Sequence, residues 1–141
     1  MPEARGDGKG KLIPIEYHIR RGARRRPGGC TCKADQVIED EEERLLSVQS
    51  YLELLQCAEN RQQHEQTKSF LKEFGFRVLP LSENIGHRAA VYIEEYSLSH
   101  GLRAGDAIIA ATAAELGLVL CTGNAKHFNP IKDLKLRIFK P

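Results

Sequence analysis

The most apolar stretch of the chain is LRAGDAIIAATAAELGLVLCTGNAKHF, at residues 102–128. Between residues 107 and 114 the only polar residue is Thr112, a pattern typical of a helix that packs inside a protein against a sheet. Gly117 is well placed to end this helix. The short apolar run at residues 118–121 then indicates a strand covered on both faces. This stretch therefore predicts a buried helix, a turn, a buried strand and a polar loop.

Hydrophobic positions recur with a regular period from Ser47 onward. Helices are expected where the period is helical and strands where short apolar runs alternate or stand between turn residues. The alternation of the two predicts a three-layer α/β/α fold with a mostly parallel sheet. Besides the central stretch, the predicted elements are helices at residues 47–60, 61–74 and 82–101 and strands at residues 76–81 and 134–139.

The first 44 residues differ in composition and show no regular period. They combine a basic run, RRGARRRPGG at residues 20–29, with an acidic run, ADQVIEDEEE at residues 34–43. Their one apolar patch, residues 12–15, contains Pro14, and proline confines a strand to the edge of a sheet or abolishes it. We therefore divide the chain into an irregular segment, residues 1–44, which is either disordered or carries a degenerate first strand, and a domain at residues 45–141.

Composition narrows the class of protein. A chain of 141 residues with 41% hydrophobic and 28% charged residues is typical of one globular domain. It has no apolar run long enough to span a membrane and no secretory signal, and its four cysteines form no zinc-binding pattern, so we expect a cytoplasmic protein. The net charge of +2 is too small to indicate nucleic-acid binding by itself.

Asp106 stands at the start of the buried helix and is the first candidate site residue. In an α/β layer the start of a helix and the carboxyl end of the next strand lie at the same edge of the sheet, so Asp106 is expected near Thr122 and Asn124. Oxygen ligands gathered in this way suit a hard divalent cation. The alternative is that Asp106 only caps its helix, a position that aspartate favours, and spacing alone supports capping more strongly.

Two other residues enter at this point. Glu53 lies opposite the apolar stripe of its helix, so periodicity alone predicts a residue in solvent. His127 follows the buried strand in the polar loop and is the one histidine that we retain as a candidate. The other four histidines are scattered and are expected at the surface or in structural roles.

Three stretches of the chain resemble the PIN-domain family, and in particular the VapC-like toxins of prokaryotic toxin–antitoxin pairs. Residues 102–128 resemble the family's segment around its third acidic residue and the strand and loop that follow. SVQSYLELLQCAEN, at residues 47–60, resembles the helix that carries the family's glutamate, and NPIKDLKLRIF resembles its closing strand. The resemblance covers about two thirds of the chain, from Ser47 to Pro141.

The resemblance implies a metal-dependent endoribonuclease that uses Mg²⁺ or Mn²⁺ to hydrolyse RNA phosphodiester bonds. Glu53 would be the acidic residue of the early helix and Asp106 that of the buried helix. Asn124, together with Thr122, would occupy the position where members of the family have Asp or Asn. The resemblance further implies a cognate antitoxin protein as partner and a homodimer.

The chain departs from the family in its first strand. PIN domains open with a strand that ends in a metal-binding Asp, usually in an L-D-T-N-like motif, whereas residues 12–16 here read LIPIE. This difference leaves two alternatives open: a catalytically impaired PIN fold that acts as a binding partner, and an unrelated α/β domain whose arginine run binds nucleic acid. Leu-Ile-Pro-Ile can be encoded as CTG-ATA-CCA-ATA, which reads Asp-Thr-Asn in a shifted frame. A frameshifted start is therefore a further hypothesis.

Overall fold

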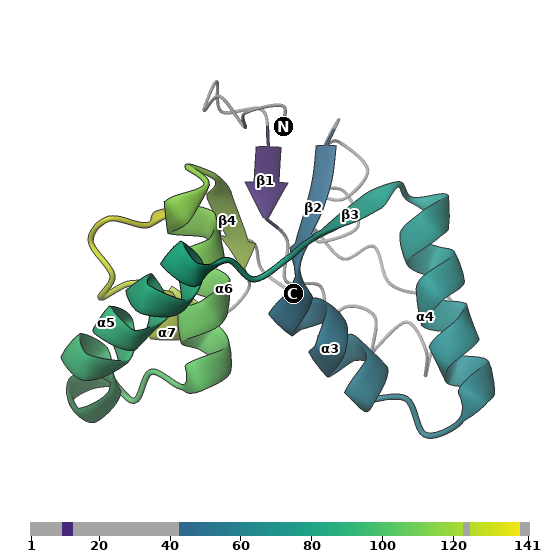
Figure 1. Ribbon diagram of the computed structural model, residues 1–141, viewed down its shortest axis with the longest axis horizontal. Coiled ribbons are helices and arrows are strands. Elements are labelled where there is room, and N and C mark those ends of the chain that lie inside the picture. The colour runs from purple at the N-terminus through teal and green to yellow at the C-terminus, as the bar shows by residue number, and fades with distance from the viewer. Residues whose placement is uncertain (1–9, 13–42, 123–124, 139–141) are drawn as a thin grey trace.

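Figure 1 shows the computed structural model of the chain, whose described residues are 10–12, 43–122 and 125–138. These residues form one sheet of five strands, with five helices packed around it. In chain order these are β1 (Gly10–Leu12), β2 (Glu43–Ser47), α3 (Val48–Gln56), α4 (Arg61–Glu73), β3 (Phe76–Leu79), α5 (Glu83–His100), α6 (Ala104–Glu115), β4 (Val119–Thr122), α7 (Ala125–Phe128) and β5 (Lys135–Ile138).

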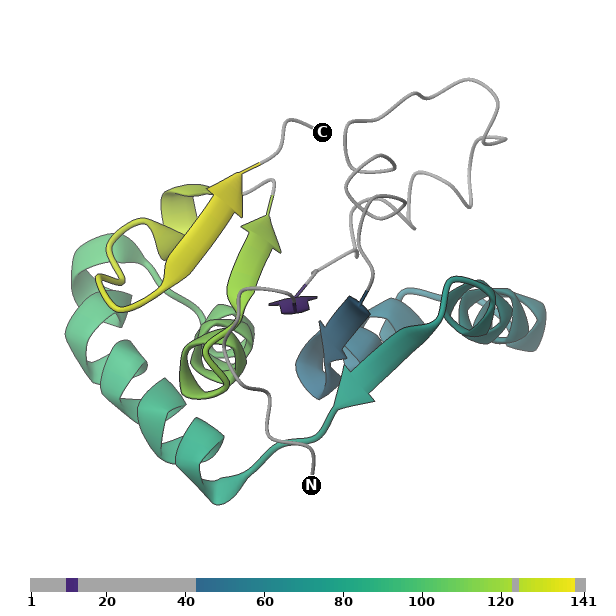
Figure 2. The ribbon, with the colours of Figure 1, turned by 90° about the horizontal axis from the view of Figure 1, so that it is seen from above.

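All strand pairings in the described part of the sheet are parallel, and the strand order is β3-β2-β1-β4-β5 (Figure 2). The predicted parallel α/β architecture is confirmed. The expectation that Pro14 would confine the first strand to an edge is wrong, because β1 is central and pairs with β2 and β4. The reason is position: β1 ends at Leu12, so each of its residues keeps the backbone N–H that proline lacks.

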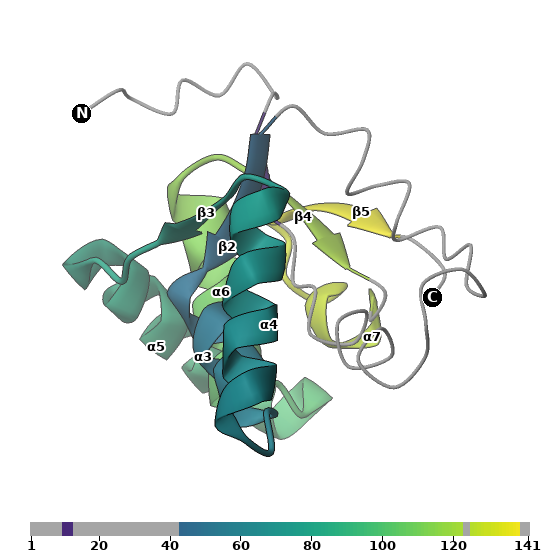
Figure 3. The same ribbon diagram turned by 90° about the vertical axis from the view of Figure 1, so that its right-hand side faces the viewer.

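The sheet is covered on both faces, which confirms the three-layer prediction. Successive strand residues point to opposite faces, and Leu45 and Leu120 belong to the hydrophobic cluster made with α5 and α6. Their neighbours Leu46 and Cys121 belong to a second cluster made with α3 and α4. Figure 3 shows α4 standing in front of the sheet and α5 and α6 on the side away from the viewer.

Helix ends lie where the predicted stop and start residues stand. The side chains of Ser47, Asn60 and Ser82 cap α3, α4 and α5 by accepting a backbone N–H three residues on, at 3.1, 2.9 and 3.2 Å. Gly117 adopts a φ of 65° just after α6, a left-handed conformation that glycine adopts without strain. The predicted C-terminal end of the buried helix and the predicted strand after it are therefore confirmed.

Two elements were not predicted. Strand β2 contains the adjacent apolar pair Leu45 and Leu46, which point to opposite faces and so give no alternating pattern. Helix α7 has four residues, too few for a helical period, and stands where a polar loop was expected. None of the helices in the described residues combines the length and apolar character needed to cross a membrane.

Candidate metal-binding site

The carboxyl ends of the parallel strands meet at one edge of the sheet, toward the bottom of Figure 1. Helix α3 begins there directly after β2, and α6 begins below that edge in the view of Figure 1 and runs back up along the sheet. Ser47 and Thr122, the last residues of β2 and β4, are 1% and 3% exposed. This is the edge where open α/β sheets bind ligands.

Asp106 lies in the first turn of α6 but does not cap the helix, so the capping alternative is wrong. The N-cap is Arg103, which makes no capping hydrogen bond through its side chain. The helix begins two residues before Asp106, at Ala104, whereas the apolar run that marks the helix in the sequence begins only at Ala107. The Asp106 carboxylate is therefore available for contacts outside its own helix.

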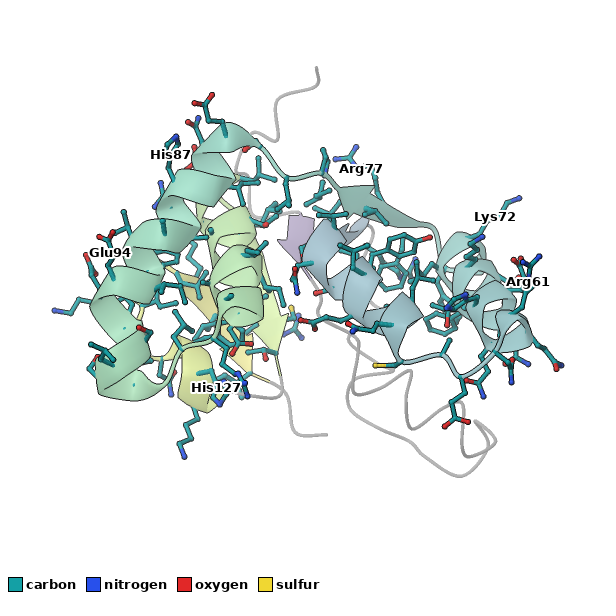
Figure 4. All side chains as sticks on the ribbon, turned by 60° about the horizontal axis from the view of Figure 1, so that its bottom comes forward. Arg61, Lys72, Arg77, His87, Glu94 and His127 are labelled. Atoms are coloured by element: carbon teal, nitrogen blue, oxygen red, sulfur yellow. The ribbon has the colours of Figure 1, made fainter. Side chains whose placement is uncertain are left out.

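His127 makes such a contact. Its Nδ1 lies 2.9 Å from Asp106 Oδ2, and the two side chains are 32% and 24% exposed. An ionised carboxylate only accepts hydrogen bonds, so Nδ1 carries the hydrogen and donates it. His127, which lies in α7, therefore contacts the first turn of α6 (Figure 4).

Glu53 lies in the middle of α3 and is half-buried, not solvated as periodicity predicted. Its Oε1 accepts a hydrogen bond of 2.9 Å from Gln49 Nε2, one helical turn earlier. The same Oε1 lies 2.7 Å from the position that a Cβ atom on Gly105 would occupy. The polar face of α3 is thus covered by a second neighbour, the first turn of α6, which a helical wheel cannot reveal.

Gly105 and Gln49 were missed by the sequence analysis although both have a signal. A Cβ on residue 105 would collide with the Glu53 carboxylate, so the glycine makes the close approach of α3 and α6 possible. Gln49 precedes Glu53 by four residues, the spacing at which helical side chains meet. Because Gly105 is the residue before Asp106, the structure brings Glu53 beside the turn that bears Asp106.

Each of the two carboxylates has an oxygen that could bind a divalent cation. Glu53 and Asp106 each have one oxygen in a hydrogen bond, and their other oxygens make none within the described residues. Mg²⁺ is commonly bound by one or two carboxylates together with water and substrate phosphates. Asn124, the third predicted site residue, lies outside the described residues. Among those described, no three His, Cys, Asp or Glu side chains gather as a metal site.

Comparison with known proteins gives a family match. The family model of the PIN domain matches residues 32–132. No curated protein sequence matches the chain. A solved toxin–antitoxin complex from Klebsiella pneumoniae is similar, with 26% sequence identity and a TM-score of 0.68, and the match covers 89% of this chain and 95% of that chain.

Two further structures are similar in fold. VapBC-1 from nontypeable Haemophilus influenzae has 24% identity and a TM-score of 0.66, with 91% of this chain and 96% of that chain covered. VapBC2 from Rickettsia felis, solved bound to a DNA fragment from the promoter of its genes, has 15% identity and a TM-score of 0.69, with coverage of 92% and 98%. At these identities the likeness concerns the fold alone.

Proposed function

The chain belongs to the PIN-domain family, and from this membership we propose that it is a metal-dependent endoribonuclease of the VapC toxin type. One observation carries the proposal. Glu53, from a helix on one face of the sheet, meets the first turn of α6 on the other face, next to Asp106. Glu53 thus lies beside the helical turn that carries Asp106, which supports a cation site shared by the two residues at the edge of the sheet where ligands bind.

The roles of the two residues follow from their chemistry. Neighbouring ionised carboxylates repel each other, and a cation held by both relieves that repulsion. Glu53 and Asp106 would hold the cation, and Gln49 keeps the Glu53 carboxylate turned toward α6 by its 2.9 Å hydrogen bond. A bound Mg²⁺ or Mn²⁺ would supply an activated water and stabilise negative charge on the RNA phosphate. By family resemblance, Asn124 would add an oxygen ligand.

Cleavage of RNA by site variants tests this function. Loss of a residue that only hydrogen-bonds to a metal ligand already lowers metal affinity or activity about 10- to 100-fold. With Mg²⁺ present, Asp106→Asn and Glu53→Gln should therefore each lower the cleavage rate at least about 100-fold. Glu94→Gln is the matched control, because it also neutralises one carboxylate but on the exposed face of α5 (Figure 4). Equal activity of Asp106→Asn and the wild type would rule out this site.

The proposed partners are an antitoxin protein, which inhibits the nuclease, and a second copy of the chain. The similar Klebsiella structure is a toxin–antitoxin complex, which supports an antitoxin for this chain too. Light scattering of the purified protein should give about twice the chain mass of 15.8 kDa. A mass that stays at one chain across the concentration range would contradict the homodimer but not the nuclease.

A second candidate is a PIN fold that binds RNA or its partner without cleaving. It is favoured by the sequence LIPIE at residues 12–16, where the family has its first acidic ligand. Two carboxylates give less charge than a hard cation usually receives from protein ligands. Calorimetric titration separates the two functions: a non-cleaving protein should bind no Mg²⁺ or Mn²⁺ in the millimolar range and still bind RNA or antitoxin.

A further inference from the structure

The hydrogen bond between His127 and Asp106 has no role in the function described so far. It joins two elements that are separate in the chain, since His127 lies in α7 and Asp106 in α6. We propose that His127 is a positioning residue, whose Nδ1–H holds one oxygen of Asp106 and leaves the other facing the cation. This inference rests on the proposed function and assigns His127 no contact with the cation.

The position of His127 is fixed by its neighbours. Phe128, the next residue, is 3% exposed and belongs to the core cluster with Ile131, which is also 3% exposed. The backbone N–H of Ile131 donates a 3.1 Å hydrogen bond to the carbonyl of Phe128, closing the turn after α7. Because both apolar side chains anchor this segment, the imidazole is presented to Asp106 from a rigid support.

Without His127, Asp106 would have another partner within reach. The first backbone N–H groups of a helix lack intrahelical acceptors, and Arg103 provides no capping hydrogen bond through its side chain. A short carboxylate in the first turn readily turns back to such N–H groups. Donation from His127 Nδ1 competes with that arrangement, so the imidazole keeps Asp106 directed away from its own helix.

Two substitutions of His127, one that keeps a hydrogen-bond donor at the position of Nδ1 and one that removes it, test the proposal. The Asn side-chain amide nitrogen stands at the same distance along the side chain as His Nδ1, whereas alanine has no donor. His127→Asn should therefore keep the hydrogen bond to Asp106 and His127→Ala should lose it. His87→Ala is the matched control, because it removes an imidazole that also pairs with a carboxylate, Glu83 at 3.5 Å, in a distant part of the molecule (Figure 4).

The readout is the affinity for Mn²⁺, measured by calorimetry on the full chain at one fixed pH for all variants. His127→Ala should bind Mn²⁺ about 10- to 100-fold more weakly than the wild type, the usual cost of losing an outer partner of a metal ligand. His127→Asn should recover most of the affinity, and His87→Ala should match the wild type.

Each other outcome overturns something definite. If His127→Ala binds Mn²⁺ as the wild type does, or if His127→Asn is as weak as His127→Ala, the positioning role is wrong and the nuclease proposal stands. If the wild type itself binds no Mn²⁺, the proposed function fails as well.

A second readout needs no metal. The ¹⁵N shifts of His127 should show hydrogen on Nδ1 in the wild type. A neutral ring with hydrogen on Nε2 alone would overturn the inference by itself.

Discussion

At the scale of single residues, Gly105 shapes the geometry of the site. A Cβ at this position would lie 2.7 Å from Glu53 Oε1 and 3.1 Å from Gln49 Nε2, the far ends of two flexible side chains, so the collision can be relieved by moving these side chains without moving the backbone. Residue 105 therefore influences where a carboxylate stands much more than whether the protein folds.

Gly105→Ala should separate function from stability. The alanine should displace Glu53 and weaken Mn²⁺ binding about 10-fold or more, as for other disturbed metal ligands. The free energy of unfolding should stay the same or rise by up to about 1 kcal/mol, because alanine favours a helix interior. Calorimetry with Mn²⁺ and urea unfolding measure the two effects.

Gly86→Ala is the control for this substitution, since a Cβ at Gly86 in α5 would meet no atom within 4 Å. It should raise stability similarly and leave Mn²⁺ affinity unchanged. Unaltered Mn²⁺ affinity in Gly105→Ala would show that the Glu53 carboxylate is not held where α3 meets α6.

The site residues differ in how far the sequence could reveal them. Asp106 was found from its place before an apolar run, because the order helix then strand fixes the edge of the sheet at which it lies. Glu53 was found only by family resemblance, since its burial depends on α6, a helix about fifty residues further along the chain. His127 was retained without a partner, because the contact with Asp106 requires both α7 and the first turn of α6.

Among the elements, α5 is fixed to its neighbours by a polar network. Arg88 donates to Glu115 at the end of α6 at 2.9 Å and to Asp133 before β5 at 2.7 Å. The Tyr92 hydroxyl donates to the same Asp133 oxygen at 2.8 Å. Burial, together with the Asp133 carboxylate that accepts its hydrogen, raises the pKa of Tyr92 to about 12.

This pKa predicts a loss of stability at alkaline pH. In the unfolded chain the tyrosine hydroxyl is in water and has a pKa of about 10. Between about pH 10 and 12 the unfolded chain therefore loses the Tyr92 proton while the folded chain still keeps it. The stabilisation from neutral Tyr92 is complete below that window and is lost as the pH rises through it.

Tyr92→Phe isolates this contribution from the other groups that ionise at high pH. Its free energy of unfolding, measured by urea titration across the window, should fall less steeply with pH than that of the wild type. Parallel slopes for the two proteins would mean that Tyr92 is not protected in the folded state.

Helix α6 predicts a second stability effect, through its alanine-rich surface. Ala107, Ala110, Ala111 and Ala113 are all 0% exposed, so the helix packs closely on every side. Ala110→Leu should lower the free energy of unfolding by about 1–3 kcal/mol through overpacking. Leu98→Ala, at a position 99% exposed, should change it by less than about 0.5 kcal/mol. Similar results for both would contradict the tight packing of α6.

Helices α3, α4 and α5 were predictable from the sequence because their signals are local. In each of the three, a capping side chain stands just before the first residue of the helix and an apolar stripe follows it. Strand β2 was not predictable, because its two buried leucines point to opposite faces and give no alternating pattern. Only its pairing with β1 and β3 identifies it as a strand. Pairing partners distant in the chain leave no local pattern.

For the molecule as a whole, the important strand comes from the segment that looked least ordered. Gly10–Leu12 pairs with β2 on one side and with β4 on the other, so it is the link between the two pairs of outer strands. Nothing in the basic and acidic runs around it indicates this position. Composition describes how a segment meets solvent, but it does not show which strands a short apolar run will join.

Removal of residues 1–34 should therefore unfold the protein, not merely remove a basic arm. Circular dichroism should show loss of the cooperative thermal transition in the truncated chain. A matched variant that replaces the arginines of residues 20–26 with serine keeps β1 and should still unfold cooperatively. A truncated chain that melts like the wild type would show that β1 is dispensable.

The sheet is joined at its centre by β1, a strand of three described residues, and its two pairings, with β2 and with β4, form the seam of the sheet. The pairings of β1 with β2 and with β4 close that seam, and hydrogen exchange detects openings whose free energy is at or below that of global unfolding. Helices α3 and α6, which carry Glu53 and Asp106, pack on opposite faces of this sheet, so their relative position depends on the strands between them. In the proposed nuclease, activity would then require the pairing of this one short strand, and native-state hydrogen exchange at Leu45 and Leu120 would report how often that pairing is lost.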